Sequence, residues 1–365
     1  MDNLSVLVLG GSVSGGGGVG NRLNLTWHAQ LGVRPVVHFK GGIDPSYFLH
    51  CTARFVDHLY DVVVLDLGPN MFGSASGTAL EALVHRVRCL SNATSTVIVD
   101  WHGAMHNNAS RVAAAHTNAT LLDLPRQAHL YAADHIHPNA RGHALIAERV
   151  RDHLARLVNL PQDAVGAPTT CPAPASELCF PLATDLPVDG VPHDWALVDD
   201  SPTPDHTHKY GWATTTIGAY LSLAIPPLAT CGAMVTLAYL ASNATGPFRL
   251  SCSAGCACSP MRNYHQQLIA PFPIVTGRED CDGNAAACHK LKVTKDTAFH
   301  LLRASDAPCR VTVAARSSKR VRIDGLYVQS PSQEYLRHIF RHPSSAPQRR
   351  FAERALNTRC GRLAR

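Results

Sequence analysis

No apolar run in the sequence approaches the length of a membrane-spanning helix, although 45% of its 365 residues are hydrophobic. A helix that crosses a bilayer needs about 20 consecutive apolar residues, so we expect no membrane span. The first 330 residues also carry no net charge, because the formal charge of +6 arises in residues 331–365, where eight arginines accompany two glutamates. A basic tail without a basic face on a structured domain does not favour nucleic acid as a partner.

Two nucleotide-binding patterns near the N-terminus are incomplete. The glycines Gly15, Gly17 and Gly20 match the dinucleotide fingerprint, but they begin several residues after the preceding apolar run and no acidic residue closes the next one. The same segment has the spacing of a phosphate loop, yet Asn21 and Arg22 stand where that loop needs a lysine and a hydroxyl side chain. We therefore expect no nucleotide and no other cofactor.

The twelve cysteines are more than an ordinary cytosolic enzyme carries, and nine of them lie in residues 171–309. Zinc sites typically need four ligands with paired C-x₂-C spacing, whereas Cys252, Cys256 and Cys258 follow C-x₃-C-x-C. Disulfides are thus favoured over a metal site, and they are typical of secreted proteins.

Six of the fourteen asparagines begin an Asn-x-Ser/Thr sequon, which also favours the secretory pathway. These asparagines are Asn3, Asn24, Asn92, Asn108, Asn118 and Asn243. Met1 is followed almost at once by a predicted core strand, leaving no room for a signal peptide. Either the natural start lies further upstream or the protein is cytosolic; we favour the first and expect a secreted or lumenal protein.

Strand-like and helical runs alternate through residues 1–160, which predicts a parallel sheet between two layers of helices, an α/β fold. The strand-like runs are Ser5–Leu9, Pro35–Phe39, Asp61–Leu67, Thr96–Asp100 and Thr120–Leu124. The helical runs are Tyr47–Leu59, Thr78–Leu90, Asn108–His116 and Ala140–Val158.

Ser12 follows the first of these strands directly. The run Val6–Leu9 has no polar alternation, which is typical of a strand buried on both faces. Gly10 and Gly11 then permit a tight turn, so Ser12 is predicted at the carboxyl end of the sheet, where open α/β sheets bind ligands. A flexible glycine-rich loop with an incidental serine is the competing interpretation.

The segment Asp134-His135-Ile136-His137-Pro138 precedes the last helical run. An acid three residues before a histidine can accept from one ring nitrogen while the other faces a serine. His135 is the rival base. Three further aspartates near predicted strand ends could serve as the acid: Asp66, Asp100 and Asp123.

Four short blocks in this region resemble those of the SGNH, or GDSL-type, hydrolases in order and rough spacing. The blocks are GGSVS at 10–14, the glycine pair at 41–42, LGPN at 67–70 and DHIHP at 134–138. The resemblance covers about residues 1–160 and implies a flavodoxin-like three-layer sheet. It also implies a catalytic triad in which Ser12 is the nucleophile, His137 the base and Asp134 the acid.

The resemblance further implies an oxyanion hole formed by the backbone N–H of Ser12, a glycine N–H and the Asn70 amide. Of the glycine pair we favour Gly42, with Gly41 close behind. One departure concerns Gly11, because the family usually has aspartate immediately before the serine. That aspartate is not a catalytic residue, so the change bears on the shape of the turn.

The remaining chain divides by composition. Residues 161–193 are proline-rich and predict a linker, and residues 194–330 hold short β-rich runs that predict a Cys-rich antiparallel β-sandwich. These runs are Thr214–Ile225, Ala233–Ala241, Phe248–Ser251, Ala298–Arg303, Val311–Ala315 and Val321–Gln329. Residues 331–365 predict a basic, largely disordered tail.

The resemblance, together with the appended β-sandwich, implies a serine esterase that removes acyl groups, acetyl in particular, from carbohydrate. Its partner is then an acylated small molecule or glycan, and its oligomeric state is open. Two alternatives stand: a catalytically inactive SGNH-like protein that binds glycan, and an O-acetyltransferase that uses the same serine, histidine and aspartate.

Overall fold

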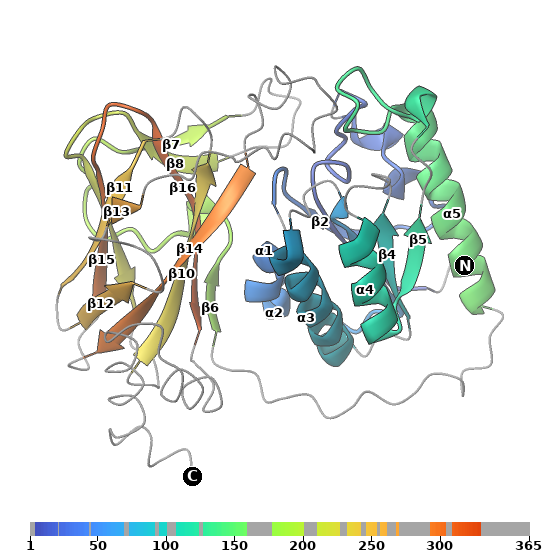
Figure 1. Ribbon diagram of the computed structural model, residues 1–365, viewed down its shortest axis with the longest axis horizontal. Coiled ribbons are helices and arrows are strands. Elements are labelled where there is room, and N and C mark those ends of the chain that lie inside the picture. The colour runs from blue at the N-terminus through green and yellow to red at the C-terminus, as the bar shows by residue number, and fades with distance from the viewer. Residues whose placement is uncertain are drawn as a thin grey trace, which may run out of the picture. The chain divides into compact units, whose positions relative to one another are not determined.

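Figure 1 shows the computed structural model of the protein. The structure describes residues 4–20, 22–43, 45–68, 73–91, 95–100, 107–123, 127–158, 177–200, 210–226, 232–241, 246–253, 256–260, 268–269, 293–303 and 309–329. The described residues form two compact units, one up to residue 158 and one from residue 177 onward.

The first unit is built on a five-stranded, all-parallel sheet with strand order β2-β1-β3-β4-β5. The strands are β1 (Val6–Gly10), β2 (Val36–Phe39), β3 (Val62–Asp66), β4 (Ser95–Asp100) and β5 (Thr120–Asp123). The helices are α1 (Pro45–His50), α2 (Thr52–Phe55), α3 (Gly73–Ser91), α4 (Asn107–Thr117) and α5 (Ala140–Val158), with short 3₁₀ turns that include η1 (Leu23–Leu25), η2 (His28–Gln30) and η5 (Ala128–Leu130). This confirms the predicted α/β class.

Helices cover both faces of this sheet, with α5 on one side and α3 and α4 on the other (Figure 1). All residues of β1, β3 and β4 are buried, as expected of apolar strands between two helical layers. Side chains alternate between the faces, so that Val6 and Val8 pack in the same cluster as Ile146 and Val150 of α5. The apolar runs in the sequence thus correspond to the central strands.

One predicted helix is divided in two. The run Tyr47–Leu59 forms α1 and α2, which are separated at Cys51, a residue with non-helical backbone angles. The Thr52 hydroxyl donates back to the carbonyls of Phe48 and Leu49 across this break. A hydroxyl that satisfies free carbonyls in this way is a common feature of irregular helices.

The second unit is an antiparallel β-sandwich, which confirms that prediction. One sheet has the order β12-β14-β10-β16-β8-β7, with β6 also paired to β16, and the other has the order β13-β11-β15-β9. The strands are β6 (Glu177–Phe180), β7 (Ala196–Asp199), β8 (Tyr210–Thr214), β9 (Tyr220–Ile225), β10 (Gly232–Ala241), β11 (Phe248–Ser253), β12 (Cys256–Pro260), β13 (Leu268–Ile269), β14 (Val293–Arg303), β15 (Cys309–Ala315) and β16 (Val321–Gln329). Leu221, Val235 and Val313 are among the residues that fill the core between the sheets.

The structure corrects two predictions in this region. The run Thr214–Ile225 contains a turn between β8 and β9, where Gly218 takes a φ of 83° that favours glycine. The predicted linker 161–193 extends too far, because its residues 177–180 form β6. This short segment holds no proline and can therefore pair as an outer strand, while nearby Pro187 uses only its carbonyl, which accepts from Ala224 N–H.

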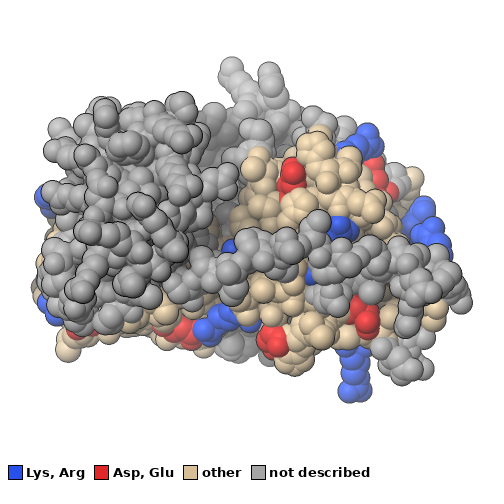
Figure 2. Space-filling model, turned by 90° about the horizontal axis from the view of Figure 1, so that it is seen from below, with Lys and Arg blue, Asp and Glu red and all other residues tan. Residues whose placement is uncertain are grey.

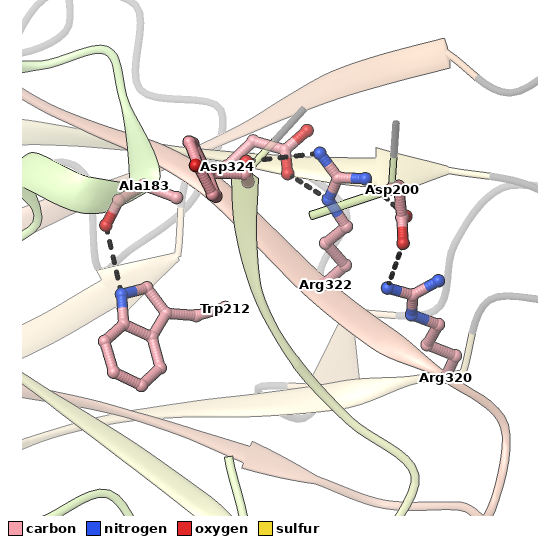
Figure 3. Close-up of polar contacts among 7 residues, drawn as sticks. Ala183, Asp200, Trp212, Arg320, Arg322 and Asp324 are labelled. Carbon is pink, nitrogen blue, oxygen red and sulfur yellow. Dashed lines mark hydrogen bonds and ion pairs between the residues drawn. The ribbon is translucent and has the colours of Figure 1, made fainter. Parts of the chain in front are cut away.

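A chain of ion pairs joins β16 to the residue after β7 (Figure 3). The buried Arg322 guanidinium donates from Nε to Asp324 Oδ1 at 2.6 Å and from Nη1 to Asp200 Oδ2 at 2.5 Å. Arg320 donates to the other oxygen of Asp200 at 2.7 Å. Although partial burial acts to raise it, these two arginines hold the pKa of the Asp200 carboxyl below its usual value.

Cysteines of both units are engaged in disulfides, as their number predicted. Cys51 and Cys89 in the first unit and Cys179, Cys252 and Cys309 in the second are all disulfide-bonded. The described part of the chain contains no free cysteine. The predicted tail, residues 331–365, lies outside the described residues.

Candidate active site

Ser12 lies just beyond the carboxyl end of β1, in a turn that its own backbone holds closed. Gly17 N–H donates to the Ser12 carbonyl at 2.8 Å, and Gly16 N–H donates to Val13 O at 3.0 Å. Gly16 and Gly18 adopt φ values of 83° and 84°, which residues other than glycine rarely adopt. The glycine-rich segment is therefore a hydrogen-bonded turn, and this argues against a loop with an incidental serine.

The turn brings Ser12 to His137. Ser12 Oγ lies 2.8 Å from His137 Nε2, and His137 Nδ1 lies 2.6 Å from Asp134 Oδ2. Ser12 is half-buried, and the His137 side chain is 24% exposed. With the serine proton directed at Nε2 and the Nδ1 proton directed at the carboxylate, these atoms form one continuous hydrogen-bonded relay that solvent can reach.

Asp134 is held as a carboxylate. Its second oxygen, Oδ1, accepts from the backbone N–H groups of Ile136 and His137, both at 3.0 Å. Partial burial acts to raise the pKa of Asp134, but the hydrogen bonds from the His137 ring and from these two amides outweigh it and hold that pKa well below its usual value. A negative charge beside Nδ1 stabilises an imidazolium at His137.

Backbone and side-chain hydrogen bonds hold the loop that carries Asp134 and His137, just before α5. Ala132 N–H donates to His137 O at 2.8 Å, and Asn139 Oδ1 accepts from the first N–H groups of α5 as an N-terminal cap. His135, the rival base, takes a φ of 56° and is exposed. The ring that meets Ser12 is that of His137.

The glycine turn packs directly on this loop. A β-carbon on Gly17 would stand 2.4 Å from His137 Cδ2, and one on Gly18 would stand 2.0 Å from Pro138 O. The sequence suggests for Gly17 only an incomplete nucleotide-binding pattern, and nothing in it marks Gly18. The role of these glycines, which is to admit the imidazole ring beside Ser12, depends on a contact between residues more than a hundred positions apart.

A buried polar network lies beneath the turn. Asp66, at the end of β3, accepts from Ser14 Oγ at 2.6 Å and from Trp27 Nε1 at 2.9 Å, while its backbone carbonyl accepts from Gly11 N–H at 2.8 Å. Asp66 thus supports the turn and is not the acid beside His137. Asp123, a second candidate for the acid, pairs with Arg111 at 2.8 Å.

Gly41, the second choice for the glycine donor, lies close to the serine. Lys40 N–H donates to Gly10 O at 3.1 Å, and a β-carbon on Gly41 would stand 3.7 Å from Ser12 Cβ. Gly42 adopts a φ of 73°, in the region that favours glycine. Asn70, the third predicted donor, lies outside the described residues.

Two other features are absent from the described residues, a metal-binding cluster and a membrane-spanning helix. No three His, Cys, Asp or Glu side chains in this part of the chain gather in a way that could hold a metal ion. No helix among those described is long and apolar enough to cross a membrane. On the face drawn in Figure 2, the visible basic and acidic side chains are interspersed among the described residues.

No protein-family model matches the chain, and no curated protein matches its sequence. A carbohydrate acetylesterase family member from Sinorhizobium meliloti is 15% identical with a TM-score of 0.35, over 43% of this chain and 100% of that chain. An acetyl xylan esterase from Butyrivibrio proteoclasticus is 11% identical with a TM-score of 0.35, over 43% and 65%. A CBM35 from Cellvibrio japonicus Abf62 is 14% identical with a TM-score of 0.29, over 43% and 95%.

Proposed function

We propose that this protein is a serine esterase of the SGNH type that hydrolyses acyl esters, acetyl esters in particular, on carbohydrate. The observation that carries the proposal is the relay of two short contacts, 2.8 Å from Ser12 Oγ to His137 Nε2 and 2.6 Å from His137 Nδ1 to Asp134 Oδ2. Both lie within the reach that nucleophile, base and orienting acid need.

In the proposed reaction, Ser12 Oγ attacks the ester carbonyl while His137 Nε2 takes the hydroxyl proton. Asp134, which stays ionised, stabilises the imidazolium that results. The imidazolium then gives the proton to the departing alcohol, and an acyl-serine forms. Water attacks this acyl group with His137 again as the base, which releases the carboxylic acid and restores Ser12.

The negative oxygen of each tetrahedral intermediate needs donors that are already in place. We assign the first donor to the backbone N–H of Ser12, which lies between two hydrogen bonds of the turn, Gly11 N–H to Asp66 O and Gly17 N–H to Ser12 O. Gly41 lies near the Ser12 side chain, and we assign the second N–H to its neighbour Gly42 and a third donor to Asn70. The site requires no metal and no cofactor for this chemistry.

The carbohydrate part of the proposal rests on the resemblance of the sequence blocks and on the β-sandwich that follows the α/β unit. Disulfides at Cys51, Cys89 and Cys309 are typical of an oxidising compartment. We therefore place the enzyme in the secretory pathway or outside the cell, where acylated glycans are available.

An O-acetyltransferase is the second candidate, since the same acyl-serine can pass its acyl group to a sugar hydroxyl. The glycan-binding alternative without activity was favoured only by Gly11. Gly11 holds the turn through its backbone, because its N–H donates to Asp66 O. Ser12 therefore lies beside His137 although position 11 carries no carboxylate.

Acetate release tests the proposal. Purified protein should release acetate from a chromogenic acetate ester and from acetylated polysaccharide, and Ser12→Ala should release none. Ser5→Ala is the matched control, because Ser5 is an exposed serine of the same unit whose hydrogen bonds to Asp61 and Val62 use only its backbone. Acetate release that persists in Ser12→Ala would contradict the proposal, and transfer to added sugar in preference to water would favour the transferase.

A further inference from the structure

A buried histidine joins the glycine turn to the helix that follows the acid–base loop. His143 lies in the first turn of α5 and is fully buried. Its Nε2 lies 3.1 Å from the carbonyl of Gly17, and its Nδ1 accepts the backbone N–H of Trp27 at 3.2 Å. No local pattern in the sequence marks this residue.

The two contacts fix the protonation of the ring. Because Trp27 N–H points at Nδ1, this nitrogen must present a lone pair, so the single ring proton sits on Nε2 and is donated to Gly17 O. A second proton on Nδ1 would face the Trp27 N–H group with no acceptor between them. The observed contacts therefore require His143 to be neutral.

Gly17 is the residue at which this bond acts on the site. Its N–H donates to Ser12 O, and its α-carbon lies against the His137 ring. His143 is also close to His137 along the chain, because α5 begins two residues after Pro138. The backbone N–H of His143 donates to Asn139 O at 2.9 Å. His143 consequently ties the segment bearing the nucleophile to the segment bearing the base.

We propose that His143 is a positioning residue that holds Ser12 and His137 at reacting distance through Gly17, and that it does so only in its neutral form. This inference rests on the proposed esterase function, because it concerns the geometry of the same relay. Protonation of His143 releases Trp27, loosens the turn and lowers the rate, in addition to the loss that protonation of His137 itself causes.

The groups that face His143 from neighbouring elements support a neutral ring. Burial lowers the pKa of His143, and His28 and His137 act in the same direction, whereas the bond to Gly17 O and the charge of Asp66 act to raise it. His28 is itself buried, and its Nε2 lies 2.8 Å from Ser14 O in the same turn. Burial also lowers the pKa of His28. The site therefore holds two buried imidazoles, and a positive charge on either one disfavours a positive charge on the other.

Three substitutions separate positioning from folding. His143→Ala removes both contacts, His143→Asn places an acceptor near the former Nδ1, and His143→Gln places a donor near the former Nε2. We expect His143→Ala to lower kcat by about 10²-fold with KM nearly unchanged, as a misplacement of about 1 Å does. Glutamine should recover most of this loss and asparagine little, because the bond to Gly17 acts on the relay.

His153→Gln is the matched control. His153 is also a buried histidine of α5, but it contacts Ser95 Oγ at 3.2 Å, at the start of β4. This variant should leave kcat unchanged. At acid pH the wild-type rate should fall more steeply than the His143→Gln rate, because only the wild type carries a ring at position 143 that can take up a proton. Equal kcat and equal pH profiles in wild type and His143→Gln, with no loss in His143→Ala, would overturn the inference, as would the same loss of kcat in His153→Gln.

Ring ¹⁵N chemical shifts test the inference independently of turnover. At pH 7 His143 should show a neutral ring protonated on Nε2, and His143→Ala should shift the His137 ring nitrogens while His153→Ala leaves them in place. If no ester is hydrolysed but these shifts are found, the proposed function fails and the positioning contact stands. A ring protonated on Nδ1, or an unmoved His137, overturns the positioning contact alone.

Discussion

The α-carbon of Gly17 lies against the imidazole of His137, so that a β-carbon at this position would stand 2.4 Å from Cδ2 and 3.0 Å from Nε2. Real β-carbons do not approach other atoms this closely, so any side chain at Gly17 must move the ring. The nearby Ser12 O, at 2.9 Å, blocks the alternative shift. The distance between Ser12 and His137 is therefore set in part by the absence of a side chain at position 17.

Gly17→Ala should lower kcat by about 10²-fold, because it displaces the His137 ring from Ser12 by a large fraction of an ångström. Steady-state kinetics on a chromogenic acetate measure the effect. Gly32→Ala is the control, since Gly32 has a φ of 78° and open space around it. That variant should lose stability through backbone strain while its kcat stays at the wild-type value. Full activity in Gly17→Ala would contradict the contact.

The two histidines of the DHIHP segment should differ sharply. His137→Ala removes the group that contacts both Ser12 and Asp134, so its kcat should fall nearly as far as that of Ser12→Ala, because residues that act as one unit are non-additive. His135→Ala should change kcat less than about threefold, since its exposed ring lies outside the relay. If only His135→Ala lowered kcat, the general base would be His135 and not His137.

Stability should decline on the acid side of neutrality. Burial lowers the pKa of His28 and of His143 below 6.5, so both are neutral in the folded protein while the unfolded chain takes up protons as pH falls through about 6.5. Their contribution to the free energy of unfolding is complete above that pH. It is lost as the pH falls toward the lower pKa values that these two histidines have in the folded protein. Asp134 acts in a different range, because its lowered pKa contributes stability that is lost only below 3.8.

Urea unfolding between pH 8 and pH 5 measures this dependence. The double variant His28→Gln, His143→Gln, which keeps a donor for Ser14 O and for Gly17 O, should lose less stability over this range than the wild type. An equal loss in both proteins would assign the pH dependence to other groups.

The ion-pair chain of the β-sandwich offers a test that is independent of activity. Asp324→Ala leaves the buried Arg322 without one of its carboxylates, and the loss of one partner of a buried pair costs about 3–5 kcal/mol. Asp189→Ala is the matched control, since it breaks the exposed pair with Arg310 and should cost less than about 1 kcal/mol. Equal unfolding midpoints for the two variants would contradict a structural role for Arg322.

The sequence predicts the α/β unit well because its central strands are continuous apolar runs, and β1, β3 and β4 are buried on both faces. It also places the parts of the site locally, since a buried strand followed by glycine positions Ser12 and a three-residue spacing pairs Asp134 with His137. That Ser12 and His137 meet across 125 positions of sequence is implied only by the resemblance of the four blocks.

The supporting residues could not be predicted in the same way. Trp27 and Ser14 meet Asp66 across 39 and 52 positions of sequence, and a lone aspartate at a strand end indicates a candidate acid as readily as a buried acceptor. The β6 strand was missed because prolines flank it, although none lies within it. Tertiary contacts decide such cases, and no local pattern encodes them.

Labelling of Ser12 by a fluorophosphonate is the most direct test of the central claim. The reagent reacts with a serine only where a base activates it and donors hold the resulting oxyanion. We expect one labelled peptide, containing Ser12, whose labelling disappears in Ser12→Ala and persists in Ser5→Ala. Labelling of Ser12→Ala at the wild-type rate, or ester hydrolysis by that variant at the wild-type rate, would contradict the assignment of Ser12 as the nucleophile.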